Sequence, residues 1–436
     1  MQGHKMQQLP RPSLARPLVA ALTAVFTAGV WAQDSSEPSP YYLGVTQGFT
    51  HDTNIYGSST NQIADTYSST GLRAGLDQII GRQRLYANAN VRYNKYRGES
   101  ALDNTSYGVA AGWDWATIND LAGTFGATAN QHLANLDTTA GVQNATGEKN
   151  LLKTDQVNAS VLWGGPRALN LQAAYAHSRV SYSALSYIGL ESSADSGSVG
   201  FNYRVGPDLR LGAAVRYVRT DSPNGYAVPI VAPATTQTYE PNTANNRNFD
   251  LTADWRPTAL TGIDARLSST RLTNSNANLS ALDFSGLTGR IGARYAVTGK
   301  TTLTASVSRD VGTNASFFNN PVAAPTGSPQ TSGTNLTHNS QTTDTFALGA
   351  KYAATAKISV DLDGSYRRAK IVYDANSALT DANDDIRNIG LGVDYAIARN
   401  WSLGCKFDHA SRSVSGNSSF SYTENRVGCT AQLTLR

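Results

Sequence analysis

The stretch Leu287-Thr-Gly-Arg-Ile-Gly-Ala-Arg-Tyr295 decides the fold of this chain. Most residues of one parity in it are apolar, those of the other parity are small or polar, and the alternation resumes over Leu303–Ser308 after a short turn at Val297–Lys300. Successive side chains of a β-strand point to opposite faces, so each segment is a strand with one apolar and one polar face. The short turn predicts that the two strands form an antiparallel hairpin.

The same alternation recurs along the whole chain, in eighteen segments. They are centred near residues 46, 72, 90, 111, 126, 158, 174, 200, 213, 251, 266, 291, 305, 348, 362, 392, 405 and 430. Every second connection is short: Ile79–Gln83, Ala116–Asp120, Gly164–Arg167, Val205–Asp208, Arg256–Ala259, Val297–Lys300, Ala353–Lys357 and Ile397–Asn400. The connections between these are longer and polar, for example Leu133–Asn150, Asp221–Asn245 and Gly312–Gln341. Short periplasmic turns and long extracellular loops are typical of transmembrane barrels.

We therefore predict an all-β protein: a transmembrane antiparallel up-and-down β-barrel of about 18 strands over residues 41–436. Sixteen strands is the alternative count, because the segments near residues 46 and 348 are weaker. A barrel of this size leaves an aqueous channel unless loops fold into it, and the candidates for such a constriction are Asp221–Asn245 and Gly312–Gln341. A soluble β-sandwich or propeller is the alternative fold, since alternation occurs in any half-buried sheet.

Proline and aromatic residues fit this division of the chain. Proline cannot donate a ladder hydrogen bond, and all fifteen prolines fall outside the interiors of the proposed strands. Tryptophan favours membrane interfaces. We expect a periplasmic-side aromatic girdle from the five tryptophans that lie near proposed short turns: Trp113, Trp115, Trp163, Trp255 and Trp401. An opposite girdle is expected from Tyr93, Tyr107, Tyr175, Tyr217 and Tyr366.

The N-terminus predicts export. Residues 1–32 contain Lys5, Arg11 and Arg16, no acid, and an apolar run of about thirteen residues that ends near Ala32, as in a secretory signal peptide. Residues 33–40 are then a short periplasmic segment. Removing the leader lowers the net charge from +4 by 3 to +1, which excludes a basic nucleic-acid binder. Beyond residue 32 the sequence has no apolar stretch near eighteen residues, the length expected of a transmembrane helix.

The polar face of the strands is expected to line water, because a lipid-facing Arg or Lys at mid-membrane depth costs about 2–4 kcal/mol. The predicted lumen-lining residues are Tyr86, Asn88, Asn90, Arg92, Asp114, Asn158, Arg210, Arg216, Asp250, Asp254, Asp264, Arg266, Arg290, Arg294, Asp361, Asp363, Asp394 and Lys406. Their mixed charge argues against a strongly ion-selective channel. Tyr86 and Tyr96 are candidates for stacking against sugar rings, with ordinary packing in the lumen as the alternative.

The two cysteines, Cys405 and Cys429, share the apolar parity in the last two segments. A hairpin centred near residue 417 places them directly opposite each other, within disulfide reach. The periplasm is oxidising, so a structural disulfide and two lipid-facing thiols both remain open. Two cysteines at this spacing form no zinc or iron–sulfur pattern, and we expect neither a metal nor a cofactor.

Histidines give only weak signals for catalysis. Five of them, scattered among loop and rim positions, lie beyond the leader: His51, His132, His177, His338 and His409. No nucleophile elbow or second catalytic motif accompanies them. We therefore expect a protein that is not an enzyme, and an outer-membrane hydrolase is the least favoured function.

Several motifs give a more specific expectation. The opening Pro40-Tyr-Tyr-Leu-Gly-Val-Thr-Gln-Gly-Phe-Thr-His-Asp-Thr-Asn-Ile-Tyr56 resembles the first strand of the outer-membrane β-barrel porin family encoded in bacterial exopolysaccharide operons. Further segments that resemble this family are Asp65–Thr70, Gly81–Tyr86, Val91–Asn94, Asn104–Gly108, Leu251–Pro257 and Asp283–Gly289. The resemblance covers essentially the whole chain beyond residue 32. It implies an outer-membrane barrel associated with exopolysaccharide synthesis or export, and it transfers no transport residues.

The leading functional expectation is therefore an outer-membrane channel or accessory barrel for exopolysaccharide export. A general diffusion porin for small hydrophilic solutes is the first alternative, and a structural or adhesive barrel with a plugged lumen is the second. The expected partners are outer-membrane lipid and, by resemblance, exopolysaccharide and other export proteins; the sequence does not give the oligomeric state. One departure from outer-membrane proteins in general is the last residue, Arg436, where an aromatic residue is common.

Overall fold

The computed structural model describes residues 39–134, 148–165, 167–228, 238–311, 340–375, 378–415 and 421–435. These ranges contain eighteen strands: β1 (Tyr41–Asp52), β2 (Asp65–Ile80), β3 (Gln83–Tyr96), β4 (Asn104–Ala116), β5 (Leu121–Leu133), β6 (Leu151–Trp163), β7 (Leu169–Tyr182), β8 (Ser192–Arg204), β9 (Leu209–Val228), β10 (Thr238–Thr258), β11 (Thr261–Asn274), β12 (Phe284–Ala296), β13 (Thr301–Asp310), β14 (Ser340–Ala353), β15 (Ile358–Ala375), β16 (Ala378–Ala396), β17 (Trp401–Val414) and β18 (Tyr422–Leu435). Short 3-10 helices follow β3, β7 and β11: η1 (Ser100–Leu102), η3 (Leu185–Leu190) and η4 (Ala277–Leu282).

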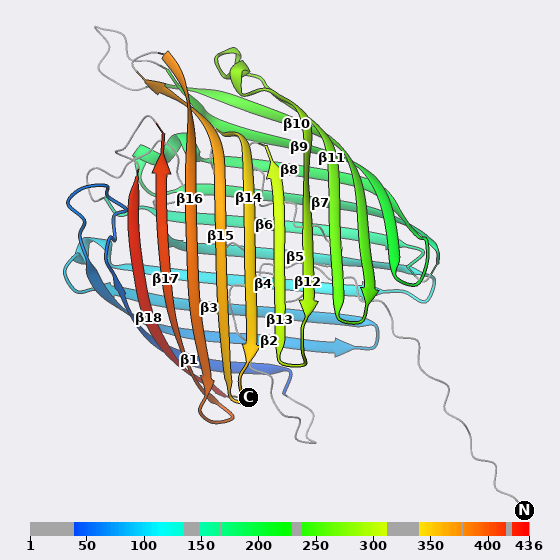
Figure 1. The fold of residues 1–436 in the computed structure, drawn as a ribbon, viewed down its shortest axis with the longest axis horizontal. Helices are drawn as coiled ribbons and strands as arrows, with labels where there is room; N and C mark the ends of the chain where they lie inside the picture. The colour runs from blue at the N-terminus through cyan, green and yellow to red at the C-terminus, as the bar shows by residue number, and fades with distance from the viewer. Residues whose placement is uncertain are drawn as a thin grey trace, which may run out of the picture.

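The eighteen strands form one closed barrel (Figure 1). Each strand pairs antiparallel with its neighbours in sequence, and β1 pairs with β18 over ten residues, from Leu43↔Leu435 to Asp52↔Arg426. Closure removes the exposed strand edges that an open sheet would leave. The prediction of an 18-stranded transmembrane barrel is confirmed, and the alternatives of sixteen strands and of a sandwich are wrong.

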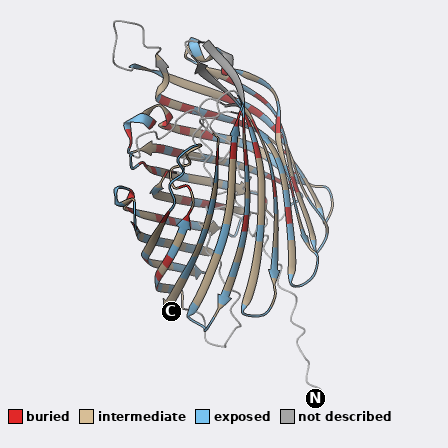
Figure 2. Cartoon of the chain, turned by 60° about the vertical axis from the view of Figure 1, so that its left-hand side comes forward, coloured by how far each residue is buried: buried red, intermediate tan, exposed pale blue. Residues whose placement is uncertain are grey.

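Apolar side chains cover the outside of the barrel instead of a central core. On β12, for example, Leu287 and Ile291 are about 60% exposed (62% and 59%), whereas Thr288 between them is buried (5%). Buried residues alternate with exposed ones along the strands (Figure 2). The buried apolar clusters in the described residues are small, and Ala134, Leu152, Val180, Ala184, Tyr187 and Leu190 form two of them near the long-loop end. An exposed apolar exterior on a closed barrel places the protein in an outer membrane.

The predicted aromatic girdle lies on this outer surface, next to the short turns. Trp113, Trp163, Trp255 and Trp401 are each more than 40% exposed. Trp115 is half-buried, and its ring centroid lies 6.3 Å from that of Trp113. At the other edge of the apolar belt, Tyr93, Tyr175 and Tyr217 are exposed. Amphipathic rings at these two levels mark the interfaces of the membrane.

One predicted loop is largely strand. The sequence suggested a loop over Asp221–Asn245, but β9 continues to Val228 and β10 begins at Thr238. Pro223 and Pro241 therefore stand inside strands, contrary to prediction. Both lie where the β9–β10 ladder is interrupted, because pairing jumps from Glu240↔Tyr226 to Asn242↔Ser222. Proline is tolerated at such irregular positions, since no ladder donor is needed there.

Pro257 is a second case. It was assigned to a short turn but lies within β10, where the register with β11 shifts between Trp255 and Thr258. Two other predictions fall on residues that are not described. The leader over residues 1–32 and most of the proposed constriction loop Gly312–Gln341 lie outside the described ranges.

Candidate functional site

The inner wall of the barrel is the candidate site, because it is where solvent-borne molecules meet the protein. All eighteen predicted lumen-lining residues lie on the strand face opposite the apolar exterior. Tyr86 shows how tightly this wall is built, since its ring lies flat over Gly112 on the neighbouring strand β4. A Cβ atom at Gly112 would come within 2.2 Å of the Tyr86 ring, so the arrangement requires glycine there.

Basic and acidic residues of the predicted set form pairs along this wall. Arg216 on β9 makes a bidentate bond to Asp250 on β10, with N–O distances of 2.8 and 3.0 Å. Both side chains are over 90% buried (8% and 7% exposed). Such planar two-point contacts are among the stronger protein ion pairs. They hold β9 and β10 together on the lumen side.

Further pairs join strands around the barrel. Arg266 Nη2 lies 3.2 Å from Asp310 on β13, which shares the polar parity. Lys406 on β17 lies 3.8 Å from Asp363 on β15 and so reaches across β16. It can do so because its register partner on β16 is Gly392, which has no side chain. Across the predicted set, seven basic residues balance seven acidic ones, so the lumen has local charge but little net charge from these residues.

Several lumen residues were missed from the sequence, most clearly a buried cluster on β15–β17. Arg412 makes a bidentate bond to Asp384 (2.9 and 3.0 Å), and Arg367 Nη2 lies 3.7 Å from the same carboxylate. The Asp384 side chain is fully buried. Parity alone could have placed these three residues inside. Their convergence depends on the register of three strands, which the sequence did not define.

A cavity of about 280 Å³ opens from the lumen near the long-loop end, between β1–β5 and β18. The aromatic rings that line it include Tyr67 and Tyr96, whose centroids lie 4.9 Å apart with an angle of 32° between the planes. Arg92, Asn94 and His132 add polar groups. Arg92 makes no ion pair with any other residue in the described part of the chain. Of these five residues, only Arg92 and Tyr96 were predicted from the sequence to face the lumen.

A charged cluster also lines this cavity. Arg426 on β18 lies 3.2 Å from Asp52 on β1 and also bonds Glu424. The cluster joins the first and last strands, since Arg426 and Asp52 are register partners. The cavity therefore presents aromatic faces, amide groups and charges of both signs.

The loop between β1 and β2 forms the rim of the cavity and is fixed by Asn54. The side-chain Nδ2 of Asn54 donates to the carbonyl oxygens of Ser58 (2.9 Å) and Thr423 (3.0 Å). In the same loop, the Tyr56 hydroxyl donates to Glu99 (2.9 Å). Burial and this hydrogen bond raise the pKa of Tyr56 to about 12. The rim is thus tied to β18 and to the next loop.

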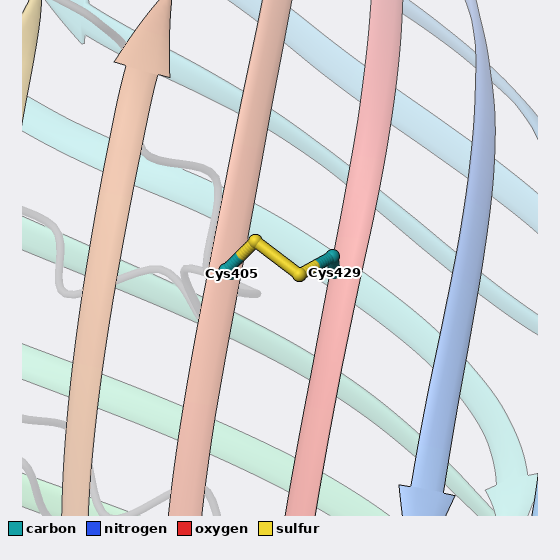
Figure 3. Close-up of a disulfide and its surroundings, with 2 residues drawn as sticks. All are labelled: Cys405 and Cys429. Atoms are coloured by element: carbon teal, nitrogen blue, oxygen red, sulfur yellow. A yellow bond between two sulfur atoms is a disulfide. The ribbon is translucent and has the colours of Figure 1, made fainter.

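The two cysteines lie on the outer face of the last hairpin. Cys405 and Cys429 are register partners on β17 and β18, with Cα atoms 4.0 Å apart, and their sulfurs are joined (Figure 3). The disulfide spans a sequence separation of 24 residues and links the last hairpin. Its position on the lipid face gives it a structural role.

No metal-binding arrangement is found in the described residues. They contain no cluster of three or more His, Cys, Asp or Glu side chains that could hold a metal ion. The Nδ1 atoms of His51, His177 and His409 contact Thr66, Asp195 and Asn425 on the outer face. His338 lies outside the described ranges. In the part of the chain that is described, no helix is long and apolar enough to cross a membrane.

Comparison with known proteins finds only distant similarities. No family model matches the chain, and no curated protein matches it. The outer-membrane protein OpdK of Pseudomonas aeruginosa, crystallised with vanillate, has a TM-score of 0.45 at 13% identity, over 91% of this chain and 99% of that one. A BenF-like porin from Pseudomonas fluorescens Pf-5 gives 0.46 at 11% identity, over 92% and 99%. The FrpB iron transporter of Neisseria meningitidis gives 0.48 at 10% identity, over 87% and 62%. At this level of similarity we transfer neither a family nor a solute to this chain.

Proposed function

We propose that this protein is an outer-membrane channel through which small hydrophilic solutes diffuse. One observation carries the proposal: a closed barrel of eighteen strands has a hydrogen-bonding, charge-bearing inner wall and an apolar outer wall. Barrels of sixteen to eighteen strands leave an aqueous lumen unless loops fill it. Charged side chains keep their hydration in such a lumen, whereas a dry interior would have to bury them at high cost.

The charge pattern favours a broad range of solutes over one class of ion. Acidic and basic residues are interspersed on neighbouring strands, as with Arg210 on β9 and Asp254 on β10, which are register partners. A single-sign field would concentrate ions of the opposite sign. An interspersed wall does this weakly, so it discriminates solutes mainly by size.

Single-channel recording tests this function. We expect the full-length protein, refolded and inserted into a planar lipid bilayer, to give steady conductance steps with weak preference between potassium and chloride. A bilayer that receives the folded protein and shows no steady openings would instead support the structural or adhesive barrel with a plugged lumen. A strong preference for one ion would contradict the balanced wall.

Exopolysaccharide export is the second candidate, and it rests on the sequence resemblance described above. Compatible features are the Tyr67–Tyr96 ring pair and the amide side chains of the wall, because sugars stack on aromatic faces and hydrogen-bond to amides. The same features serve other hydrophilic solutes.

Deleting the gene separates the two candidates. If the barrel exports polymer, the deletion strain loses surface polysaccharide, and a plasmid copy restores it. If the barrel is a diffusion channel, the polymer is unchanged, and uptake of small hydrophilic solutes slows. Proteoliposomes that contain the purified barrel and swell in small sugars would support the diffusion channel independently.

A further inference from the structure

The outer surface of the barrel carries arginines just beyond the apolar belt, on the long-loop side. Several of them are neutralised. Arg309 on β13 makes a bidentate bond to Asp344 on β14, with N–O distances of 2.6 and 2.8 Å. Arg368 on β15 bonds Asp385 on β16 in the same way, at 2.7 and 3.3 Å. Alternating charges thus form a matched row on this part of the exterior.

Two arginines on β10 and β11, which β12 separates from this row, differ from it. Arg247 on β10 and Arg271 on β11 are register partners, and both are exposed (β10 and β11 lie side by side in the green part of Figure 1). Like charges directly opposite each other on neighbouring strands are destabilising. Within the described ranges neither arginine forms an ion pair or a side-chain hydrogen bond.

The neighbours of the two arginines do not supply a counter-charge. The register places Tyr217 beside Arg247, and Ser285 beside Arg271. Asp283, two residues before Ser285, accepts hydrogen bonds from the backbone and side-chain nitrogens of Asn274. Neither arginine is therefore bonded to a carboxylate, and the pair presents two positive charges to its surroundings.

The level of Arg247 and Arg271 along the membrane normal shows which part of the membrane surrounds them. Arg247 is eight residues along β10 from Trp255 in the girdle at the opposite edge. A tilted strand rises about 2.5 Å per residue along the membrane normal, so the two levels are about 20 Å apart, close to the height of the apolar band. Phe249 and Leu267, just below the pair, are about half exposed (50% and 52%) and face lipid. The arginines thus lie at the level of the outer-leaflet headgroups.

We propose that Arg247 and Arg271 form a binding site for the phosphorylated headgroup of an outer-leaflet lipid. Guanidinium groups bind phosphate oxygens through two parallel N–H bonds. One phosphate between two arginines removes their mutual repulsion and supplies the missing negative charge. The exposed apolar side chains immediately below receive the acyl chains of the same molecule. This inference concerns the outer face and does not depend on the proposed function of the lumen.

Lipid binding by matched variants tests the site. The probe is bis-phosphorylated lipid A, added to the full-length refolded protein in neutral detergent, and the bound lipid is counted by native mass spectrometry. The test variant is Arg247→Gln/Arg271→Gln. Its control is Arg309→Gln/Arg368→Gln, which loses the same charge from arginines that already have acidic partners. Heat-dependent migration on gels verifies that each barrel is folded.

We expect the wild type and the control to bind lipid A alike, and the test variant to bind at least about tenfold less, as the loss of charge-assisted bonds implies. An Arg247→Lys/Arg271→Lys variant should recover part of the binding, because it keeps the charge. Equal binding by all variants would overturn the proposal. Full competition by inorganic phosphate, at the concentration used for the lipid, would also overturn it, because this indicates a site for free anions. A barrel dimer that disappears in the test variant would overturn it as well, because this indicates a contact between two copies of the chain.

Discussion

At the scale of single residues, the lumen depends on where small side chains allow large ones to lie flat. Tyr86 lies along the wall because Gly112 leaves space under its ring. We expect Gly112→Ala to push the ring into the lumen and to lower single-channel conductance. Gly262→Ala is the matched control, because a Cβ atom there meets no heavy atom within 4 Å.

The double variant Gly112→Ala/Tyr86→Ala decides the cause of this effect. If the displaced ring narrows the lumen, removing it restores the conductance to the wild-type value or above. A conductance that stays low in the double variant would show that the added methyl group acts through the backbone instead.

The disulfide gives a second prediction at this scale. In the chain-entropy description, a cross-link that closes about 25 residues stabilises a fold by about 3 kcal/mol. We expect Cys405→Ser/Cys429→Ser to fold but to unfold at a lower urea concentration. The wild type treated with reductant should behave like the variant, whereas the variant should not respond to reductant. Identical unfolding of the oxidised wild type and the variant would contradict a stabilising role.

The face of the barrel that a residue occupies was more predictable from the sequence than its contacts with residues of other strands. The two-residue alternation was sufficient to predict which face Arg216 or Asp250 would occupy. It was not sufficient to predict that Arg367, Asp384 and Arg412 meet, since they lie on three strands whose register is fixed only when the sheet forms. The Tyr67–Tyr96 pair was missed for the same reason, because parity alone does not place two rings from different strands against each other.

At the scale of elements, the hairpin is the unit that the sequence predicts well. Where a short turn separates two alternating segments, the sequence was sufficient to predict the hairpin. The β9–β10 hairpin was underestimated because Pro223 and Pro241 were taken as loop residues. The structure places them at a break in the ladder, so proline excludes regular pairing at its own position but not the continuation of a strand beyond it.

Ion pairs within and between strands should contribute to the free energy of unfolding according to their burial. Asp250→Asn leaves Arg216 buried without its carboxylate, and we expect a loss of about 3 kcal/mol in the free energy of unfolding. In Asp254→Asn the affected partner, Arg256, is 58% exposed, and the expected loss is below about 1 kcal/mol. Urea unfolding in lipid vesicles measures both. Equal losses would mean that burial does not set the strength of these pairs.

At the scale of the whole molecule, closure of the barrel determines where apolar and polar side chains can lie. The β1–β18 pairing joins the two ends of the sheet, so apolar side chains can face outward all round and polar ones can share a single interior. The sequence predicted this arrangement because the alternation of apolar and polar residues along each strand defines both of its faces. It could not predict the cavity at the long-loop end, which depends on how a loop after β1, several strands and β18 come together.

The central claim is that hydrocarbon surrounds this barrel and water fills it, and spin labels along β12 test it most directly. Single labels at residues 287–294, in protein reconstituted in bilayers, report collisions with dissolved oxygen, which concentrates in lipid, and with a water-soluble nickel chelate. We predict strict alternation: high oxygen accessibility at Leu287, Ile291 and Ala293, and high nickel accessibility at Thr288, Arg290 and Arg294. Low nickel accessibility along both faces of the strand would contradict the account.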